Sequence, residues 1–328
     1  MCAIVPVEKC SRRKFFGYSG ASLALASGGA LAQSIAPSPP GQKTDPSAQR
    51  IATENDAAKH LTVSVTIGGK GPFRFVVDTG ADRSVIADDV AAYLGLIRGP
   101  TVTVQGVVKS LLSQTVTVHD LNFGAGRRFD LMMPVLPRVL LQADGYLGLD
   151  AIDGYRVLFD FHHNALVITE PRHVIIPGLI PPSQVKVQLR GSQGHLRSMN
   201  CRVDGVPTTT FIDTGAEISV GNTKLLEALL DRDPAYFIIG TLPITGVTGG
   251  QMNGQLTEVR NVRLNPLTFS GCVLLIADLQ IFALWDLLND PALLIGMNFL
   301  RQFQQVSIDY GRKELMFDLA STRIAQRA

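Results

Sequence analysis

The chain has 328 residues, enough for two domains of ordinary size, and 46% of them are hydrophobic, enough for sizeable buried cores. Its 30 Lys and Arg residues nearly balance its 28 Asp and Glu residues, and the formal net charge is +2. Because a protein that binds nucleic acid needs an excess of positive charge, this balance predicts no nucleic-acid partner.

Residues 1–32 have the pattern of an export signal. The basic segment Ser11-Arg12-Arg13-Lys14-Phe15-Phe16 precedes an apolar stretch of small residues, and Ala30-Leu31-Ala32 then fits a signal-peptidase site. The paired arginines resemble a bacterial twin-arginine signal, which predicts a periplasmic or secreted protein. The alternative is an N-terminal membrane anchor, although the stretch is short for a span and is diluted by Gly and Ser. We expect no stable membrane span after cleavage.

Composition divides the rest of the chain into five segments. Residues 33–57 are rich in Pro, Ser, Gln and Ala and predict a flexible leader, which is either a spacer or a short activation segment. Two folded halves are predicted over 58–169 and 185–318. The Pro-rich residues 170–184 between them predict an extended linker, and 319–328 form a tail.

In the first half, apolar and polar residues alternate over 61–67 and an apolar run follows over 73–77. This pattern predicts a β-hairpin that ends at Asp78. A short helix is predicted over 87–94, because two acidic residues occupy its first turn and a glycine follows it. Further strands are predicted at 101–108, 112–121 and 129–135.

The sequence at the end of this hairpin is repeated once in the chain. Phe75-Val76-Val77-Asp78-Thr79-Gly80-Ala81 recurs as Thr210-Phe211-Ile212-Asp213-Thr214-Gly215-Ala216, 135 residues later, and Ser84 and Ser219 follow at matching positions. Each copy is typical of a buried strand that ends in a tight turn. Two such halves can bring their carboxyl groups together, where they share one proton because like charges at close range cannot both ionise.

The second half repeats the order of the first. Strands are predicted at 185–189, 199–203 and 208–212, a helix at 223–230 and a strand at 242–247. A helical turn over 282–288 holds the only Trp of the chain, Trp285, and a last strand precedes Gly296.

A second pair of motifs, Tyr146-Leu147-Gly148 and Leu294-Ile295-Gly296, follows the two acids. With both pairs the chain resembles the aspartic peptidases, most closely their retropepsin-like branch, over about residues 58–318. The resemblance implies an all-β fold with a few short helices. It implies two homologous β-barrel lobes, joined in one chain as in the pepsin-like arrangement, with the active site at their interface.

The resemblance also implies roles for the repeated residues. Asp78 and Asp213 would activate a water that attacks a peptide bond, and which of them is acid and which base is a property of the pair. Thr79 and Thr214 would form hydrogen bonds across the interface between the lobes, and Gly80 and Gly215 would permit the tight turns after the acids. The hairpins at Gly106 and Gly246 are candidates for flaps that cover the bound substrate. Ala81 and Ala216 stand where pepsin-like enzymes have Ser, which predicts an only mildly acidic optimum.

The predicted function is therefore that of an aspartic endopeptidase with a peptide or protein substrate and no cofactor. Two alternatives of the same fold are a non-catalytic peptide-binding module and a processing factor for one substrate. The six histidines lack metal-ligand spacing, so no metal site is expected. Asp150 is interpreted as a structural acid near a turn. Cys201 and Cys272 are compatible with a disulfide or with two buried thiols.

Overall fold

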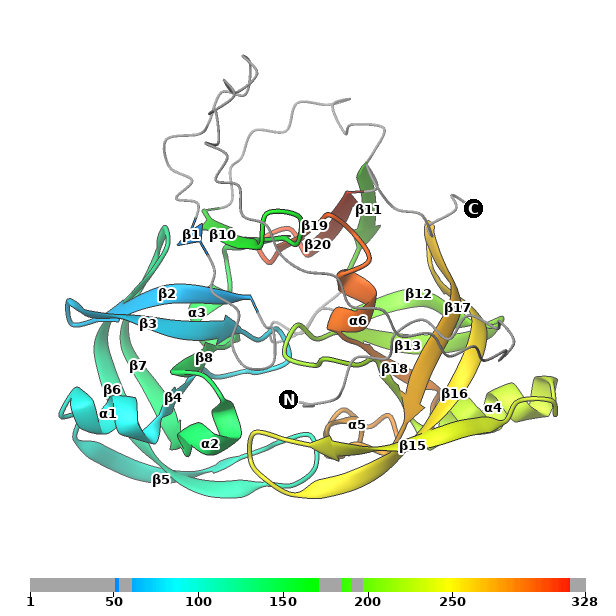
Figure 1. Ribbon diagram of the computed structural model, residues 1–328, viewed down its shortest axis with the longest axis horizontal. Coiled ribbons are helices and arrows are strands. Elements are labelled where there is room, and N and C mark those ends of the chain that lie inside the picture. The colour runs from blue at the N-terminus through cyan, green and yellow to red at the C-terminus, as the bar shows by residue number, and fades with distance from the viewer. Residues whose placement is uncertain (1–50, 53–60, 171–183, 190–196, 319–328) are drawn as a thin grey trace, which may run out of the picture. The chain divides into compact units, whose positions relative to one another are not determined.

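The computed structural model describes residues 51–52, 61–170, 184–189 and 197–318 (Figure 1). The predicted signal peptide, nearly all of the leader and of the linker, and the tail lie outside the described residues. None of the helices in the described ranges has the length and apolar character needed to cross a bilayer.

The first half folds into a seven-stranded sheet that closes on itself. Its strands follow the order β2 (Thr62–Ile67), β3 (Lys70–Val77), β8 (Gly145–Leu147), β4 (Val85–Ala87), β7 (Gly126–Leu136), β6 (Leu111–Phe123), β5 (Arg98–Val104). An additional pairing of β2 with β6 closes the ring and leaves β5 at the edge. Alternation of buried and exposed residues along these strands places the apolar side chains inside the barrel.

The second half has a seven-stranded sheet with the equivalent order. The strands are β12 (Arg197–Val203), β13 (Val206–Ile212), β18 (Ala292–Ile295), β14 (Val220–Gly221), β17 (Leu267–Ile276), β16 (Gln251–Leu264), β15 (Ile238–Thr245). Here β12 pairs with β16 to close the ring. The repeat in the sequence is therefore a repeat in the fold, and the predicted pair of β-barrel lobes is confirmed.

A third sheet joins the halves. Its order is β1 (Ile51–Ala52), β10 (Ala165–Thr169), β9 (Arg156–Asp160), β19 (Gln305–Asp309), β20 (Glu314–Asp318), β11 (Gln184–Gln188). The central pair is antiparallel β9 and β19, one from each half. Two segments differ from their predicted places: Ile51–Ala52 of the expected leader pairs with β10, and β11 lies in this sheet instead of the second barrel.

Short helices lie between the strands. They are α1 (Asp88–Tyr93), α2 (Arg138–Leu141), α3 (Leu149–Ile152), α4 (Thr223–Arg232), α5 (Gln280–Leu284) and α6 (Met297–Leu300). Asn222 caps α4: its Oδ1 accepts from Leu225 N at 2.9 Å and from Ala292 N at 3.0 Å. The cap therefore fixes the helix to the central strand β18.

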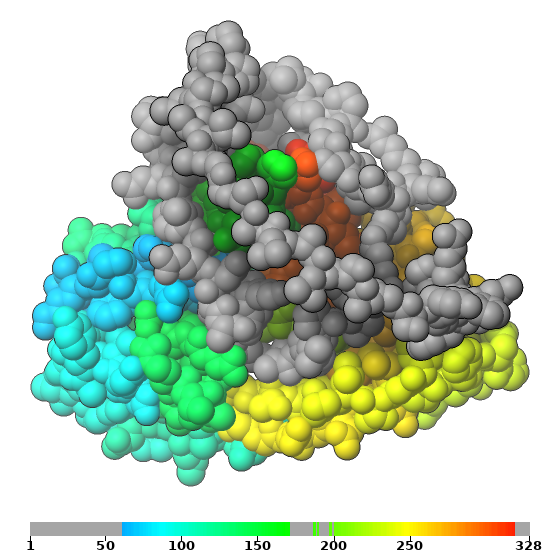
Figure 2. All heavy atoms as spheres, viewed as in Figure 1, coloured from blue at the N-terminus to red at the C-terminus, as the bar shows by residue number. Residues whose placement is uncertain are grey.

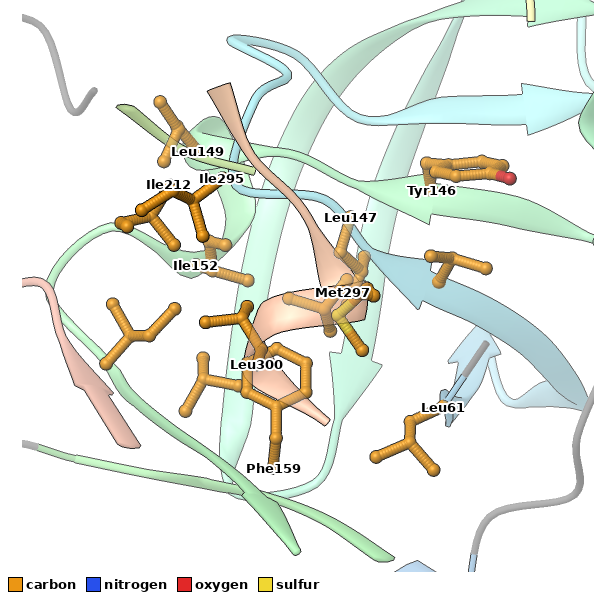
Figure 3. Close-up of a cluster of buried hydrophobic side chains, with 14 of the residues drawn as sticks. Leu61, Tyr146, Leu147, Leu149, Ile152, Phe159, Ile212, Ile295, Met297 and Leu300 are labelled. Atoms are coloured by element: carbon orange, nitrogen blue, oxygen red, sulfur yellow. The ribbon is translucent and has the colours of Figure 1, made fainter. Parts of the chain in front are cut away.

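The hydrophobic core crosses the boundary between the halves (Figure 3). Leu147 and Ile152 of the first half belong to the same buried cluster as Ile212, Ile295 and Met297 of the second. Because each such side chain contributes about 1.5–3 kcal/mol when fully buried, this packing stabilises the pairing of the lobes within one chain.

Candidate active site

Two central strands deliver the repeated acids. Strand β3 runs parallel to β8 and ends one residue before Asp78, and β13 runs parallel to β18 and ends one residue before Asp213. Each acid is held by its backbone, since Asp78 N donates to Leu147 O at 3.0 Å and Asp213 N donates to Ile295 O at 2.9 Å. The two apolar pairs before Gly148 and Gly296 are therefore the partners of the acid-bearing strands.

Reciprocal threonine bonds lock the two loops together. The Thr79 hydroxyl donates to Ile212 O at 2.8 Å and accepts from Thr214 N at 3.0 Å. The Thr214 hydroxyl donates to Val77 O at 2.7 Å and accepts from Thr79 N at 3.2 Å. All of these groups are buried, so breaking one bond would leave an unsatisfied polar group at the junction.

The glycines allow each loop to touch the opposite carboxyl group. A methyl group at Gly80 would lie 2.7 Å from Asp213 Cγ, and one at Gly215 would lie 2.5 Å from Asp78 Cγ. No side chain larger than hydrogen fits at these distances. The structure thus brings Asp78 and Asp213 to one place, with Gly80 and Gly215 packed between them.

The alanines anchor the loops through their backbones. Ala81 O accepts from Leu149 N, and Ala216 O accepts from Met297 N, each at 2.8 Å. Helices α3 and α6 therefore begin directly beside the two acid loops.

Burial and mutual repulsion set the charge of the pair. Gly80 N donates to Asp78 Oδ1 at 2.9 Å, and Gly215 N donates to Asp213 Oδ1 at 2.8 Å. Burial, followed by the Asp78 charge and a hydrogen bond with its carboxyl group, raises the pKa of Asp213 to about 7, although the Gly215 N–H opposes the shift. A proton therefore stays on the pair well above the pH at which an isolated aspartate loses it.

Two serines that carried no predicted role brace this arrangement. Ser84 Oγ donates to Asp150 Oδ1 at 2.6 Å and accepts from Gly148 N at 3.0 Å. Ser219 Oγ makes the same bonds in the second half, to Asn298 Oδ1 at 2.7 Å and from Gly296 N at 3.0 Å. Their matching places after the two Asp-Thr-Gly-Ala copies were the signal that could have found them.

A cleft of about 990 Å³ opens over both acids and is lined by residues of both lobes, including Gly106 and Val247. The two flap candidates lie against each other across it. A Cβ at Gly106 would overlap Thr248 Oγ1, and one at Gly246 would lie 3.0 Å from Val107 Cγ2. Figure 2 shows the cyan-to-green surface of the first half adjoining the yellow surface of the second.

Two further hydrogen bonds join the loop around Gly106, the flap candidate of the first lobe, to the second lobe. Thr248 Oγ1 donates to Lys109 O at 2.6 Å, and Gln280 N donates to Val107 O at 2.9 Å. Gln280 belongs to α5, the helical insertion of the second half. The loop around Gly106 is therefore held over the cleft by contacts with the opposite lobe.

The remaining candidate groups lie elsewhere. Cys201 and Cys272 are both free and buried, so the disulfide alternative is not what the structure shows. Burial, the largest cause for both, raises the pKa of Cys201 to about 11 and that of Cys272 to about 12, which keeps both thiols protonated. Within the described ranges, no group of three or more His, Cys, Asp or Glu side chains is placed to hold a metal ion.

Comparison with known families assigns the chain. A family model described as aspartyl protease matches residues 63–151 and 199–299, which together make up more than half of the chain. Each matched region contains one Asp-Thr-Gly-Ala loop and the apolar strand that lies beside it. No curated protein matches the chain. The chain belongs to the aspartyl protease family.

Proposed function

We propose that this protein is an endopeptidase that cleaves peptide bonds with a water molecule held between Asp78 and Asp213. The observation that carries the proposal is the contact of each acid with the opposite glycine loop, since it places two carboxyl groups at one point of a cleft. The raised pKa of Asp213 supports a pair that carries one proton and one negative charge.

In the first step the ionised carboxylate takes a proton from the water, and the resulting hydroxide oxygen bonds to the peptide carbonyl carbon. The protonated carboxyl group gives its proton to the carbonyl oxygen, which yields a neutral diol. In the second step the newly protonated carboxyl group donates to the nitrogen, the other carboxylate takes a proton from one diol hydroxyl, and the C–N bond breaks. The pair ends with one proton, as it began.

The substrate that fits this cleft is an extended peptide. Strand β5 lies at the edge of its sheet, and Val102, Val104 and Gly106 in and beyond it line the cleft. A peptide main chain can bond to such an edge in the way of an added strand. The flap tip held by Thr248 would cover the bound chain and keep bulk water away from the reaction.

We further propose that the protein works outside the cytoplasm, in the periplasm or after secretion. The support is the pattern of residues 11–32, with its paired arginines and small-residue cleavage site. Replacing Arg12 and Arg13 by Lys should leave the precursor inside the cell, and fractionation with an antibody would reveal an unchanged distribution if the proposal is wrong.

The test of the activity uses two single-atom replacements, Asp78→Asn and Asp213→Asn, and a mixed peptide library. Each variant should lose about 10³-fold or more in kcat/KM, because an amide cannot share the proton or activate water. Thermal unfolding should stay close to that of the wild type, since the threonine bonds are untouched. A statine-type inhibitor should block the wild-type protein. Undiminished cleavage by either variant would overturn the mechanism.

A further inference from the structure

The walls of the cleft differ between the two lobes. On the first side the lining is mainly aliphatic, with Val85, Val102 and Val104, and includes two charged residues, Asp82 and Arg83. On the second side the lining combines aliphatic and aromatic residues with one arginine: Arg197, Phe211, Ile281, Leu284, Trp285 and Leu294. The first side also contributes an aromatic residue, Tyr146, which is almost fully buried, and an arginine, Arg83, which is exposed. The second side differs in having a stacked pair of aromatic rings, Phe211 and Trp285, next to its arginine.

The three distinctive side chains form one corner of the cleft. Phe211 lies two residues before Asp213, and its ring stacks on Trp285 with centroids 4.0 Å apart and an interplanar angle of 23°. Arg197 is the cross-strand partner of Phe211 in the β12–β13 pair. Its guanidinium carbon lies 5.8 Å from the centre of the Phe211 ring. The positive charge of Arg197 therefore lies beside two stacked aromatic rings, close to the acid pair.

The charge of Arg197 lacks a counterion among the described residues. Its Nη2 donates to Thr209 Oγ1 at 3.1 Å, which is a neutral partner. Its Nε is buried and has no hydrogen-bond partner in the described parts of the chain. By contrast, Arg301 on the same lobe is neutralised by Glu217 at 2.6 Å. An arginine that is half-buried and unpaired beside a substrate cleft is suited to receive an anion.

We propose that this corner is a subsite for a substrate side chain that carries a carboxylate, Asp or Glu, and that Arg197 binds it. The inference rests on the proposed peptidase activity, for which it defines the substrate class. The guanidinium would donate charge-assisted hydrogen bonds to the carboxylate, and the apolar stem of the side chain would lie on Phe211 and Trp285.

The distance of this corner from the acids limits the position of the acidic residue along the substrate. A β-strand rises about 3.3 Å per residue, so Phe211 lies roughly 7 Å and Thr209 roughly 13 Å from Asp213 along β13. Arg197 spans these two positions through its ring contact and its hydrogen bond. An extended peptide has about the same rise per residue, so a side chain that reaches this corner should lie about two to four residues from the bond that is cut.

The experiment compares peptides that differ only by Glu or Gln, placed in turn at each of the four positions on either side of the cleaved bond. For the wild-type protein, the Glu peptide should exceed the Gln peptide in kcat/KM by on the order of tenfold at one position. In Arg197→Met this ratio should fall to about one, and Arg197→Lys should restore part of it because it keeps the charge.

Two further variants are the controls. Arg202→Met removes an exposed arginine of the same strand that lies outside the cleft and bonds to Gly205 O, and it should keep the full ratio. Arg83→Met removes the other arginine of the cleft. If the preference survives in Arg197→Met and disappears in Arg83→Met, or if wild type shows no preference at any position, the subsite inference is overturned and the peptidase proposal stands.

Binding gives a readout that does not depend on cleavage. Trp285 is the only tryptophan of the chain and lies in the corner itself, so its fluorescence reports occupancy. If no peptide is cut, the proposed function fails, and titration of wild type and Arg197→Met with the same peptides still tests the subsite. Tighter binding of the Glu peptide that is lost in Arg197→Met supports it, whereas equal binding of both peptides contradicts it.

Discussion

The two lobes are almost identical where the acids meet and different where a substrate would lie. Both deliver an acid from a central strand, fix it by a backbone bond of about the same length, and cross-link it through a threonine hydroxyl. The walls around this centre differ more, since the first side is mainly aliphatic, whereas the second has the stacked rings of Phe211 and Trp285 beside Arg197. Under the proposed function, this difference assigns the chemistry to the duplicated core and the choice of substrate to the diverged residues around it.

Small differences exist inside the shared core as well. Asp213 is buried, with 7% of its surface exposed, whereas Asp78 is half-buried. Ser84 bonds to a carboxylate, Asp150, but Ser219 bonds to the amide of Asn298. At these two places the first half is therefore the more open and has an acid where the second has an amide.

The largest expected effect comes from the acid loops, where the two halves should behave alike. In Gly80→Ala or Gly215→Ala the new methyl group would lie 2.5–2.8 Å from atoms of the opposite carboxyl group. The carboxyls must move, so kcat/KM should fall by about 10²-fold or more in both variants. Gly240→Ala is the matched control, because its Cβ would meet only Leu256 Cδ1 at 3.7 Å. Normal turnover in either loop variant would contradict the close contact.

The flap tips should respond unequally. A methyl group at Gly106 would collide with Thr248 Oγ1 and would lie 2.8 Å from the backbone oxygen of Lys109, which cannot move alone. A methyl group at Gly246 would meet Val107 Cγ2 at 3.0 Å, and that side chain can rotate. Steady-state kinetics should therefore show a several-fold rise of KM in Gly106→Ala and little change in Gly246→Ala. Equal effects would show that the tips are interchangeable.

The acid pair should also respond to added hydroxyl groups. The raised pKa of Asp213, about 7, predicts that kcat/KM declines as the pH rises through neutrality, because the pair then loses its shared proton. In Ala81→Ser with Ala216→Ser, a hydroxyl that donates to the carboxylate favours ionisation. A bond of ~1 kcal/mol would move this decline down by roughly 0.7 pH unit. An unchanged pH profile would refute the role assigned to the alanines.

The smallest expected effect is on thermal stability and concerns the different partners of the two serines, Asp150 in the first half and Asn298 in the second. Burial, the largest cause, raises the pKa of Asp150 although bonds from Ser84 lower it, so the folded protein favours the protonated carboxyl group. That contribution to stability is present below the ordinary pKa of 3.8 and is lost as the pH rises through the raised value. Asp150→Asn should thus raise Tm by about 2 °C at pH 7 and by nothing at pH 3.5.

The reverse change in the other half is the control for this prediction. Asn298→Asp places a carboxyl group beside Ser219 and should lower Tm at pH 7 but not in acid. Thermal unfolding of both variants at the two pH values is the measurement. A change of the same size at both pH values would show that packing, not ionisation, distinguishes the two residues.

Much of the fold could be predicted because each copy of the repeated motif is short and contiguous in the sequence. An apolar run followed by Asp-Thr-Gly-Ala specifies a buried strand and a tight turn within seven residues, and two copies imply two acids that meet. A helical turn was expected over 282–288, and α5 lies at Gln280–Leu284, directly before Trp285. The contact of Trp285 with Phe211 was not expected, because the two residues are far apart in sequence and no local pattern records their stacking.

Other features depend on pairings that a single sequence does not reveal. The central pair of the third sheet joins β9 to β19, and nothing in Arg156–Asp160 indicates that its partner lies in the other half. Arg197 lies just before the strand predicted over 199–203 and carried no predicted role, because the absence of a counterion among the described residues emerges only when neighbouring strands are placed. Thr248 likewise gains its bond to Lys109 O from tertiary structure alone.

The central claim is that Asp78 and Asp213 share a single proton. Nuclear magnetic resonance of protein labelled with carbon-13 at the aspartate carboxyl groups can count the protons on the two residues directly. At pH 6 the account predicts one proton on the pair, which is lost as the pH rises through about 7, and a lower pKa of Asp213 when Asp78 is replaced by Asn. Two fully ionised carboxyl groups at pH 6, each indifferent to replacement of the other, would contradict it.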